Sequence, residues 1–188
     1  VTGVHGKSTT ASLLSYIFTL ADLKPSYLVG TAFIPDLGVN GHWDQGKYFI
    51  VEGDEYVRSK SDPTPKFLDL YPDTTIITTL EWEHVDVYPS VEDMERVFHK
   101  LLQKTKSKVV ACRDWNSIQN IIEDDKEKII TYGITHEAEW QMCDFIQKLH
   151  YSNYTVKRKH RLFDEFELNL MGRFNALNAL ACTIVSLH

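Results

Sequence analysis

Residues 2–9 read Thr2-Gly3-Val4-His5-Gly6-Lys7-Ser8-Thr9, and this short glycine-containing stretch decides how the rest of the chain is interpreted. Glycines let a backbone approach a phosphate group closely, and the amides at the start of a helix converge on it. Lys7 can bring a positive charge to the β- and γ-phosphates, and the Ser8 hydroxyl can hold Mg²⁺. Only Val4 and His5 separate the two glycines, so the loop is shorter than the common phosphate-loop pattern. The stretch predicts a phosphate-binding loop; the alternative is a helix cap that contains Gly-Lys-Ser by chance.

The pattern after this loop alternates between helices and strands. Apolar residues at helical spacing predict a helix from Lys7 to Ala21, which places Lys7 at the end of a solvated loop. A second helix is expected after Ser90, a capping residue with Asp93 three positions later. A third is expected from about Asn116. Short apolar or β-branched runs predict buried strands at residues 48–51, 74–80, 108–111 and 128–131.

The last quarter of the chain has a different pattern. Between residues 151 and 170, apolar residues alternate with polar ones, as in a half-exposed antiparallel strand. A helical run follows from Phe174 to Leu187. The expected fold is therefore α/β: a P-loop-type, mostly parallel sheet flanked by helices, with a small antiparallel sheet. We treat residues 1–188 as one domain. Because Val1 stands directly before the loop, we expect a piece of a longer polypeptide.

Composition narrows the class of protein. Hydrophobic residues make up 43% of the 188 residues and charged residues 24%, as in ordinary globular proteins. The net charge of -6 argues against nonspecific nucleic-acid binding, which needs a basic surface. No apolar run has the length of a membrane span, so no membrane partner is expected. The three scattered cysteines indicate neither a disulfide framework nor a zinc site, and we expect a cytoplasmic protein.

Acidic residues follow two of the expected strands. Glu52, Asp54 and Glu55 come directly after residues 48–51, at the strand end where ligands gather in open α/β sheets. A carboxylate there is well placed to bind Mg²⁺, although acids also occupy solvated turns. Residues 80–86, Leu-Glu-Trp-Glu-His-Val-Asp, follow the next strand. His84 in this segment is a candidate ligand of a second metal ion, or a structural histidine bonded to a loop carbonyl.

Together these elements resemble the central domain of the Mur ligases. That family carries a short loop with the pattern of residues 2–9 and an acid-rich strand end like residues 52–55. It also carries an acid-His-x-Asp segment like residues 83–86. Near the end of the domain it has Gly-x-His-Asn-x-x-Asn-Ala, which residues 172–179 match at every position except Phe174. The motifs occur in the family's order and cover almost the whole chain.

The resemblance implies ATP and Mg²⁺ as cofactors and assigns a role to each matching residue. Lys7, Glu52 and His84 would be catalytic. Ser8 and Glu52 would hold one Mg²⁺ ion and His84 a second. Asn178 would contact the adenine, with Asn175 close by. The residues implied in nucleotide binding are Gly3, Val4, His5, Gly6, Lys7, Ser8, Thr9, Asn175 and Asn178.

The resemblance also implies a reaction. In this family a carboxylate is activated as an acyl phosphate, an amine attacks it, and the tetrahedral intermediate collapses to an amide. The closest similarity is to the murein peptide ligases, judged on Asp54-Glu55-Tyr56, the long insert before Tyr71 and residues 80–84. The partners would then be UDP-N-acetylmuramate and a cell-wall peptide. The alternatives are a UDP-N-acetylmuramate–L-alanine ligase, with an amino acid as the amine, and a non-catalytic nucleotide-binding module.

Two departures limit what the resemblance carries over. Phe174 stands where the family has histidine, so that contact is lost or replaced. Several members also use a carbamylated lysine downstream of the metal-binding histidine. The corresponding place here is near His99 and Lys100, and we do not carry the carbamate over.

Overall fold

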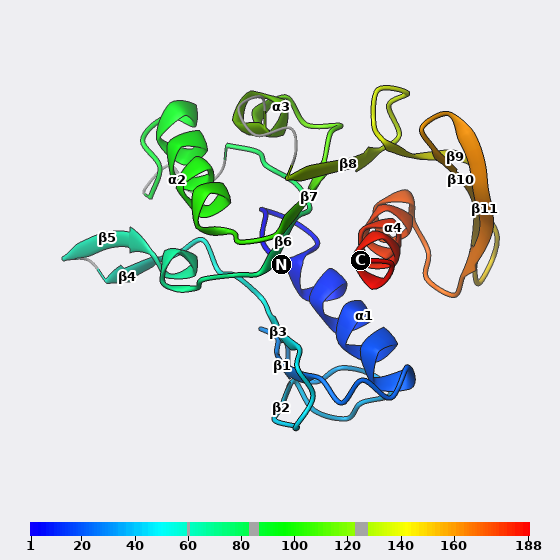
Figure 1. Ribbon diagram of the computed structural model, residues 1–188, viewed down its shortest axis with the longest axis horizontal. Coiled ribbons are helices and arrows are strands. Elements are labelled where there is room, and N and C mark those ends of the chain that lie inside the picture. Colours follow the sequence, from blue (N-terminus) through cyan, green and yellow to red (C-terminus); the bar gives the residue numbers. More distant parts are fainter. Residues whose placement is uncertain (60, 83–86, 123–127) are drawn as a thin grey trace.

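The computed structural model describes residues 1–59, 61–82, 87–122 and 128–188. Within these residues, four α-helices and one 3₁₀ helix are interspersed among the strands (Figure 1). The helices are α1 (Lys7–Leu20), η1 (Lys66–Asp69), α2 (Val91–Lys104), α3 (Asn116–Ile122) and α4 (Arg173–Ser186). The strands are β1 (Ser26–Leu28), β2 (Gly41–His42), β3 (Phe49–Val51), β4 (Val57–Ser59), β5 (Asp62–Pro65), β6 (Thr74–Ile77), β7 (Lys108–Cys112), β8 (Ile129–Gly133), β9 (Trp140–Gln147), β10 (Ser152–Arg158) and β11 (Arg161–Leu168).

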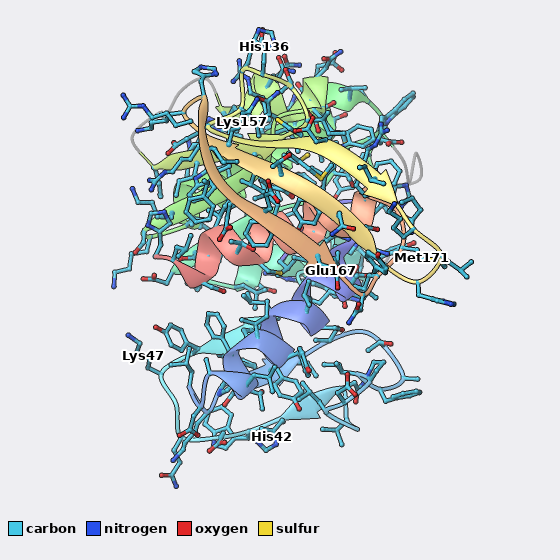
Figure 2. The ribbon with its side chains drawn as sticks, turned by 90° about the vertical axis from the view of Figure 1, so that its right-hand side faces the viewer. His42, Lys47, His136, Lys157, Glu167 and Met171 are labelled. Carbon is cyan, nitrogen blue, oxygen red and sulfur yellow. The ribbon has the colours of Figure 1, made fainter. Side chains whose placement is uncertain are left out.

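The main sheet has six strands in the order β11-β10-β9-β8-β7-β6. Strands β6 to β9 pair in parallel, and β9, β10 and β11 pair antiparallel. The inner strands are rich in valine and isoleucine because both of their faces are covered, whereas β11 is largely exposed. Figure 2 looks onto the outer face of the antiparallel part, with α4 behind it.

The first two residues join this sheet to a second, smaller one. Strand β3 lies at the edge of the three-stranded sheet β2-β1-β3, and its Val51 carbonyl accepts a hydrogen bond from the amino group of Val1 over 2.8 Å. On the other side, the Thr2 amide donates to the Ile76 carbonyl of β6 over 2.8 Å. The start of the chain therefore runs between β3 and β6, and this position aims residues 3–7 at the carboxyl ends of both strands.

Helices cover both faces of the main sheet. Helix α4 contacts β7, β8, β9 and β10 and packs against α1, whereas α2 and α3 pack together on the opposite face (Figure 1). Helix α4 is apolar nearly all round, as expected for a helix enclosed by a curved sheet and a neighbouring helix. Its inner residues, Ala176, Leu180, Ala181, Cys182 and Ile184, are fully buried.

The α/β class predicted from the sequence is confirmed. The predicted helices match α1, α2, α3 and α4, and the predicted strands match β3, β6, β7 and β8 to within a few residues. The antiparallel strands are also present, and they extend the parallel sheet through β9 instead of standing apart from it. A separate two-stranded antiparallel sheet, β4-β5, lies in the insert before η1. Strands β1, β2, β4, β5 and β9 were not anticipated.

Candidate functional site

The loop before α1 is shaped by its two glycines. Gly3 has φ 125° and Gly6 has φ 82°, a region of backbone conformation that side chains rarely allow. A Cβ atom on Gly3 would also lie 2.5 Å from Thr78 Oγ1 and 2.7 Å from the Thr79 carbonyl. Gly3 therefore has to be glycine on two grounds, which explains why the loop can lie directly on the end of β6.

Two threonines just beyond β6 hold the loop in place. The Val4 amide donates to the Thr79 carbonyl over 3.1 Å, and the His5 amide donates to Thr79 Oγ1 over 2.8 Å. The Thr78 hydroxyl donates to the His5 carbonyl over 2.5 Å. These contacts fix the backbone ahead of the first turn of α1, where Lys7, Ser8 and Thr9 begin the helix. Sequence reasoning did not identify Thr78 or Thr79.

Lys7 lies in a tighter setting than the sequence suggested. Its ammonium group donates to the Gly3 carbonyl over 2.7 Å and to the Val4 carbonyl over 3.1 Å. It also pairs with Glu55, at 2.9 Å from Oε2. The two side chains are only 14% and 4% exposed. The expectation of a solvated Lys7 is therefore wrong, because the acid-rich end of β3 folds over the loop and supplies a buried counter-charge.

Glu52 is held at both carboxylate oxygens. Its Oε1 accepts a hydrogen bond from the Ser8 hydroxyl over 2.8 Å, and its Oε2 accepts one from the Gly30 amide over 2.7 Å. The Glu52 amide in turn donates to the Leu28 carbonyl over 3.0 Å, which continues the pairing of β1 with β3. The strand ends of β1 and β3 thus present one oriented carboxylate to the start of α1.

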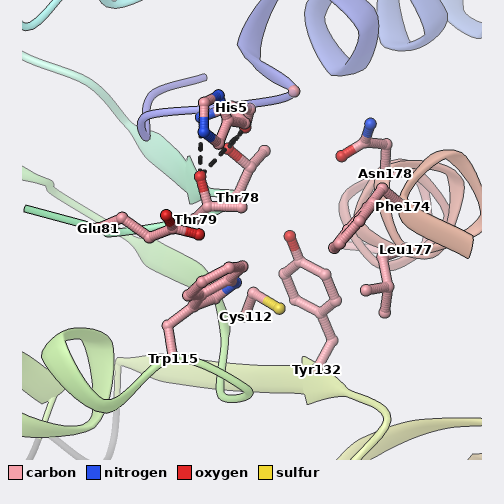
Figure 3. A pocket seen from close by; sticks show the side chains of 11 residues that line it. His5, Thr78, Thr79, Glu81, Cys112, Trp115, Tyr132, Phe174, Leu177 and Asn178 are labelled. Carbon is pink, nitrogen blue, oxygen red and sulfur yellow. Dashed lines mark hydrogen bonds between the residues drawn. The ribbon is translucent and has the colours of Figure 1, made fainter. Parts of the chain in front are cut away.

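A cleft of about 190 Å³ opens beside the loop (Figure 3). Its wall combines aromatic and apolar side chains with a few polar groups. The lining residues are His5, Gly6, Thr78, Thr79, Glu81, Cys112, Trp115, Tyr132, Phe174, Leu177 and Asn178. They come from the loop, from the ends of β6, β7 and β8, and from the first turns of α4. The cleft is thus continuous with the loop through His5 and Gly6.

The two asparagines predicted from the end of the chain lie differently. Asn178 is buried, lines the cleft, and lies so near the loop that a Cβ atom on Gly6 would be 2.7 Å from its Oδ1. Asn175 is one turn earlier and donates its side-chain amide to the Met171 carbonyl over 2.8 Å. It does not line the cleft. The structure therefore brings Asn178 to the loop of residues 3–7 and leaves Asn175 at the helix start.

The other site residues predicted from the sequence lie either in the loop or in the segment after β6. Gly3, Val4, His5, Gly6, Lys7, Ser8 and Thr9 all belong to the loop and the first turn of α1. His84 lies outside the described residues, so its part in the site stays a prediction. Among the residues that are described, no group of three or more His, Cys, Asp or Glu side chains is arranged to hold a metal ion. A metal here would need ligand oxygens beyond the side chains of Ser8 and Glu52.

Burial sets the protonation state of the tyrosines around the site. Burial raises the pKa of Tyr132 well above its usual value, and also that of Tyr88, where Glu55 adds to the shift. The Tyr88 hydroxyl stays protonated and donates to the Glu55 carbonyl over 2.8 Å. Tyr88 thereby fixes the backbone of the residue that pairs with Lys7. The sequence analysis had named Glu55 only as one of three acids at the strand end, and it had not identified Tyr88 or Tyr132.

Comparison with known proteins places this geometry in a family context. The family model described as the Mur ligase middle domain matches residues 1–186. A UDP-N-acetylmuramate–L-alanine ligase of Caldanaerobacter subterraneus is 31% identical over 189 residues, covering 99% of this chain and 39% of the relative. The corresponding ligase of Chlorobium phaeobacteroides is 30% identical, covering 96% of this chain and 38% of the relative. The chain thus spans well under half the length of these relatives.

Solved structures of Mur ligases have the same fold as this chain. UDP-N-acetylmuramate:L-alanyl-gamma-D-glutamyl-meso-diaminopimelate ligase from Neisseria meningitides superposes with a TM-score of 0.83 at 28% identity, covering 99% of this chain and 59% of that one. A MurF ligase from Thermotoga maritima, solved in complex with ADP, superposes with a TM-score of 0.73. That second neighbour is only 14% identical, with 100% of this chain and 44% of its own covered. In the part of the chain that is described, no helix is long and apolar enough to cross a membrane.

Proposed function

This chain belongs to the Mur ligase family through its middle domain, and on that premise we propose that it is the ATP-binding domain of an amide-forming ligase. The reaction proposed joins the carboxylate of UDP-N-acetylmuramate to the amine of a cell-wall peptide through an acyl phosphate. The observation that carries the proposal is the meeting of Lys7, Ser8 and Glu52 at the start of α1. This arrangement suits a nucleoside triphosphate and its metal ion.

The oxygens beside the loop fit Mg²⁺. Ser8 Oγ and Glu52 Oε1 lie 2.8 Å apart, and hard oxygen donors of this kind are the ligands that Mg²⁺ prefers. Mg²⁺ usually takes only one or two protein ligands and completes its shell with phosphate oxygens and water. Bound there, the ion would neutralise charge on the transferring phosphoryl group. His84 remains a proposed ligand of a second Mg²⁺ ion on the family resemblance alone.

The chain's own residues would bind and orient the phosphates. The glycines of the loop let backbone amides approach them, and the start of α1 adds partial positive charge. Lys7 would stabilise the charge that develops on the γ-phosphoryl group as it moves to the carboxylate. Glu55 would hold the Lys7 ammonium group in position along the loop, since the two groups are in contact. Asn178 would meet the base, because it lies between the loop and the cleft.

The identity of the amine rests on two lines of similarity. The structure with a TM-score of 0.83 is a ligase named for L-alanyl-gamma-D-glutamyl-meso-diaminopimelate, and this supports a tripeptide as the amine. The relatives at 30% and 31% identity are named for L-alanine, and they support the alternative. We favour the tripeptide because the insert that suggested it contains the paired strands β4 and β5 and the helix η1, and Arg58 in this insert pairs with Asp62 and Asp69.

One assay tests the proposal. The protein that carries this chain, expressed at its natural length, is incubated with ATP, Mg²⁺, UDP-N-acetylmuramate and either the tripeptide or L-alanine. We expect mass spectrometry to find the UDP-muramyl-tripeptide, with one ADP formed for each amide. Product from L-alanine alone would establish the alternative amine. Nucleotide binding without ADP or amide formation from either amine would contradict the proposed function and leave a non-catalytic module.

A further inference from the structure

The hydroxyl group of Tyr132 is aimed into the cleft beside the loop. Tyr132 lies on β8, is only 1% exposed, and directs its hydroxyl into the cleft between Asn178 and Trp115 (Figure 3). Over the residues that the structure describes, no hydrogen bond joins this hydroxyl to another group. Because the ring is buried and its hydroxyl opens onto the cleft, this hydroxyl can donate a hydrogen bond to a molecule bound there.

The side chains around Tyr132 indicate what kind of chemical group would fit in the cleft. Trp115 and Phe174 contribute aromatic surface to the same cleft, and Asn178 adds an amide that can both donate and accept. Because burial raises its pKa, Tyr132 stays protonated and can donate a hydrogen bond. A flat ring with acceptor atoms on its edge would satisfy all of these groups. The ring nitrogens of a purine base are such acceptors.

We propose that the Tyr132 hydroxyl donates a hydrogen bond to a ring nitrogen of the purine base of the bound nucleotide. The base would occupy the cleft while its phosphates reach the loop, which borders the cleft at His5 and Gly6. Tyr132 would then be a specificity-determining residue contributed by β8. This inference rests on the proposed function, because it presupposes that a nucleotide binds at the loop.

The test separates contact with the base from contact with the phosphates. Tyr132→Phe removes only the hydroxyl, and binding of ATP and of inorganic tripolyphosphate is measured by calorimetry for both proteins. We expect ATP to bind the variant about three- to tenfold more weakly, the usual effect of losing one hydrogen bond, with tripolyphosphate unchanged. Tyr154→Phe is the matched control, because Tyr154 is also buried and lies on β10 against Phe166, away from the cleft.

Analogues of ATP identify the ring nitrogen that accepts the proposed hydrogen bond from Tyr132. Each analogue replaces one purine ring nitrogen by carbon, and we expect one of them to bind the parent protein more weakly while binding Tyr132→Phe no more weakly than ATP does. Unchanged ATP affinity in Tyr132→Phe would overturn the inference, as would additive losses with every analogue. An equal loss for tripolyphosphate would also overturn it, because Tyr132 would then act through the shape of the loop. A parent protein that binds neither ATP nor tripolyphosphate would instead contradict the proposed function.

Discussion

Ser8 donates its hydroxyl hydrogen to Glu52 Oε1 over 2.8 Å, so the first turn of α1 and the end of β3 meet at one pair of oxygens. The second carboxylate oxygen of Glu52 is held by the Gly30 amide at 2.7 Å. A carboxylate fixed at both oxygens has a single orientation before any metal binds. Preorganisation of this kind lowers the cost of binding, because little is left to be ordered.

Glu52→Gln tests whether this carboxylate is a metal ligand. Glutamine keeps the shape and can still accept from Ser8, but it lacks the negative charge that a hard cation prefers. We expect the Mg²⁺ concentration for half-maximal ATP hydrolysis or ligation to rise by about tenfold or more, with a small change in melting temperature. The measurement is a Mg²⁺ titration of ADP release at saturating ATP. An unchanged titration curve would make Glu52 an ordinary strand-end acid.

Gly30→Ala tests whether the contact between Gly30 and Glu52 Oε2 orients the same carboxylate. A Cβ atom on Gly30 would lie 3.1 Å from Glu52 Oε2, so the carboxylate has to shift. We expect a rise of about tenfold in the Mg²⁺ requirement, as for other groups that orient a metal ligand. Gly41→Ala is the matched control, because its Cβ would make only ordinary contact, 3.5 Å from Leu28 Cδ1. Equal Mg²⁺ titrations for the two variants would contradict a positioning role for Gly30.

The helices and the inner parallel strands could be predicted because their signals are local. Ser90 illustrates this: its Oγ accepts from the Asp93 amide over 3.1 Å, as the capping pattern indicates. Strand β1 has three residues, too few for periodicity to show. Strand β9 did carry a signal, since Trp140 and Met142 point inward and alternate with Gln141 and Cys143, and it was overlooked.

The site was predictable where its chemistry follows from a local sequence motif, as in residues 2–9, or from a strand end. Glu52 could be proposed because acids after a buried strand lie at the ligand-binding edge. The pairing of Lys7 with Glu55 could not, because it depends on how the chain turns after β3. Tyr132 was out of reach for another reason: its place in the cleft depends on the order of strands across the sheet, which the sequence does not state.

Titration of the Cys182 thiol should lower the free energy of unfolding as the pH rises above about 9. It is fully buried on α4, and burial raises the pKa of its thiol from 9.0 to about 12. Above about pH 9 the unfolded chain loses this proton while the folded protein keeps it. The stabilising contribution is therefore complete below pH 9 and is lost as the pH rises toward 12. At pH 10 the loss is about 1 kcal/mol, since one pKa unit corresponds to about 1.4 kcal/mol.

The measurement for Cys182 is a comparison of urea unfolding curves near pH 7, 9 and 10. Cys182→Ala removes the titrating group, so we expect its free energy of unfolding to fall less between pH 9 and 10 than that of the parent protein. The variant will be less stable near pH 7 because it leaves a small cavity. Buried groups that do not interact with Cys182, such as Cys112, titrate in both proteins and cancel in the comparison. Parallel pH profiles would show that Cys182 does not contribute.

Variants of Lys7 and Glu55 should show different effects on the free energy of unfolding and on ADP release. Their side chains are 14% and 4% exposed, so Lys7→Met removes the cation from a buried carboxylate and should lower the free energy of unfolding by about 3 kcal/mol. Adding Glu55→Gln removes the buried charge and should restore about 1–3 kcal/mol. ADP release should stay absent in the double variant, because the charge at the γ-phosphate is still missing.

The exposed pair Lys66–Asp54 is the control, and we expect its coupling energy to be below about 1 kcal/mol. Additive losses at Lys7 and Glu55 would contradict the buried pair, and near-normal ADP release in Lys7→Met would contradict the phosphate-loop assignment itself.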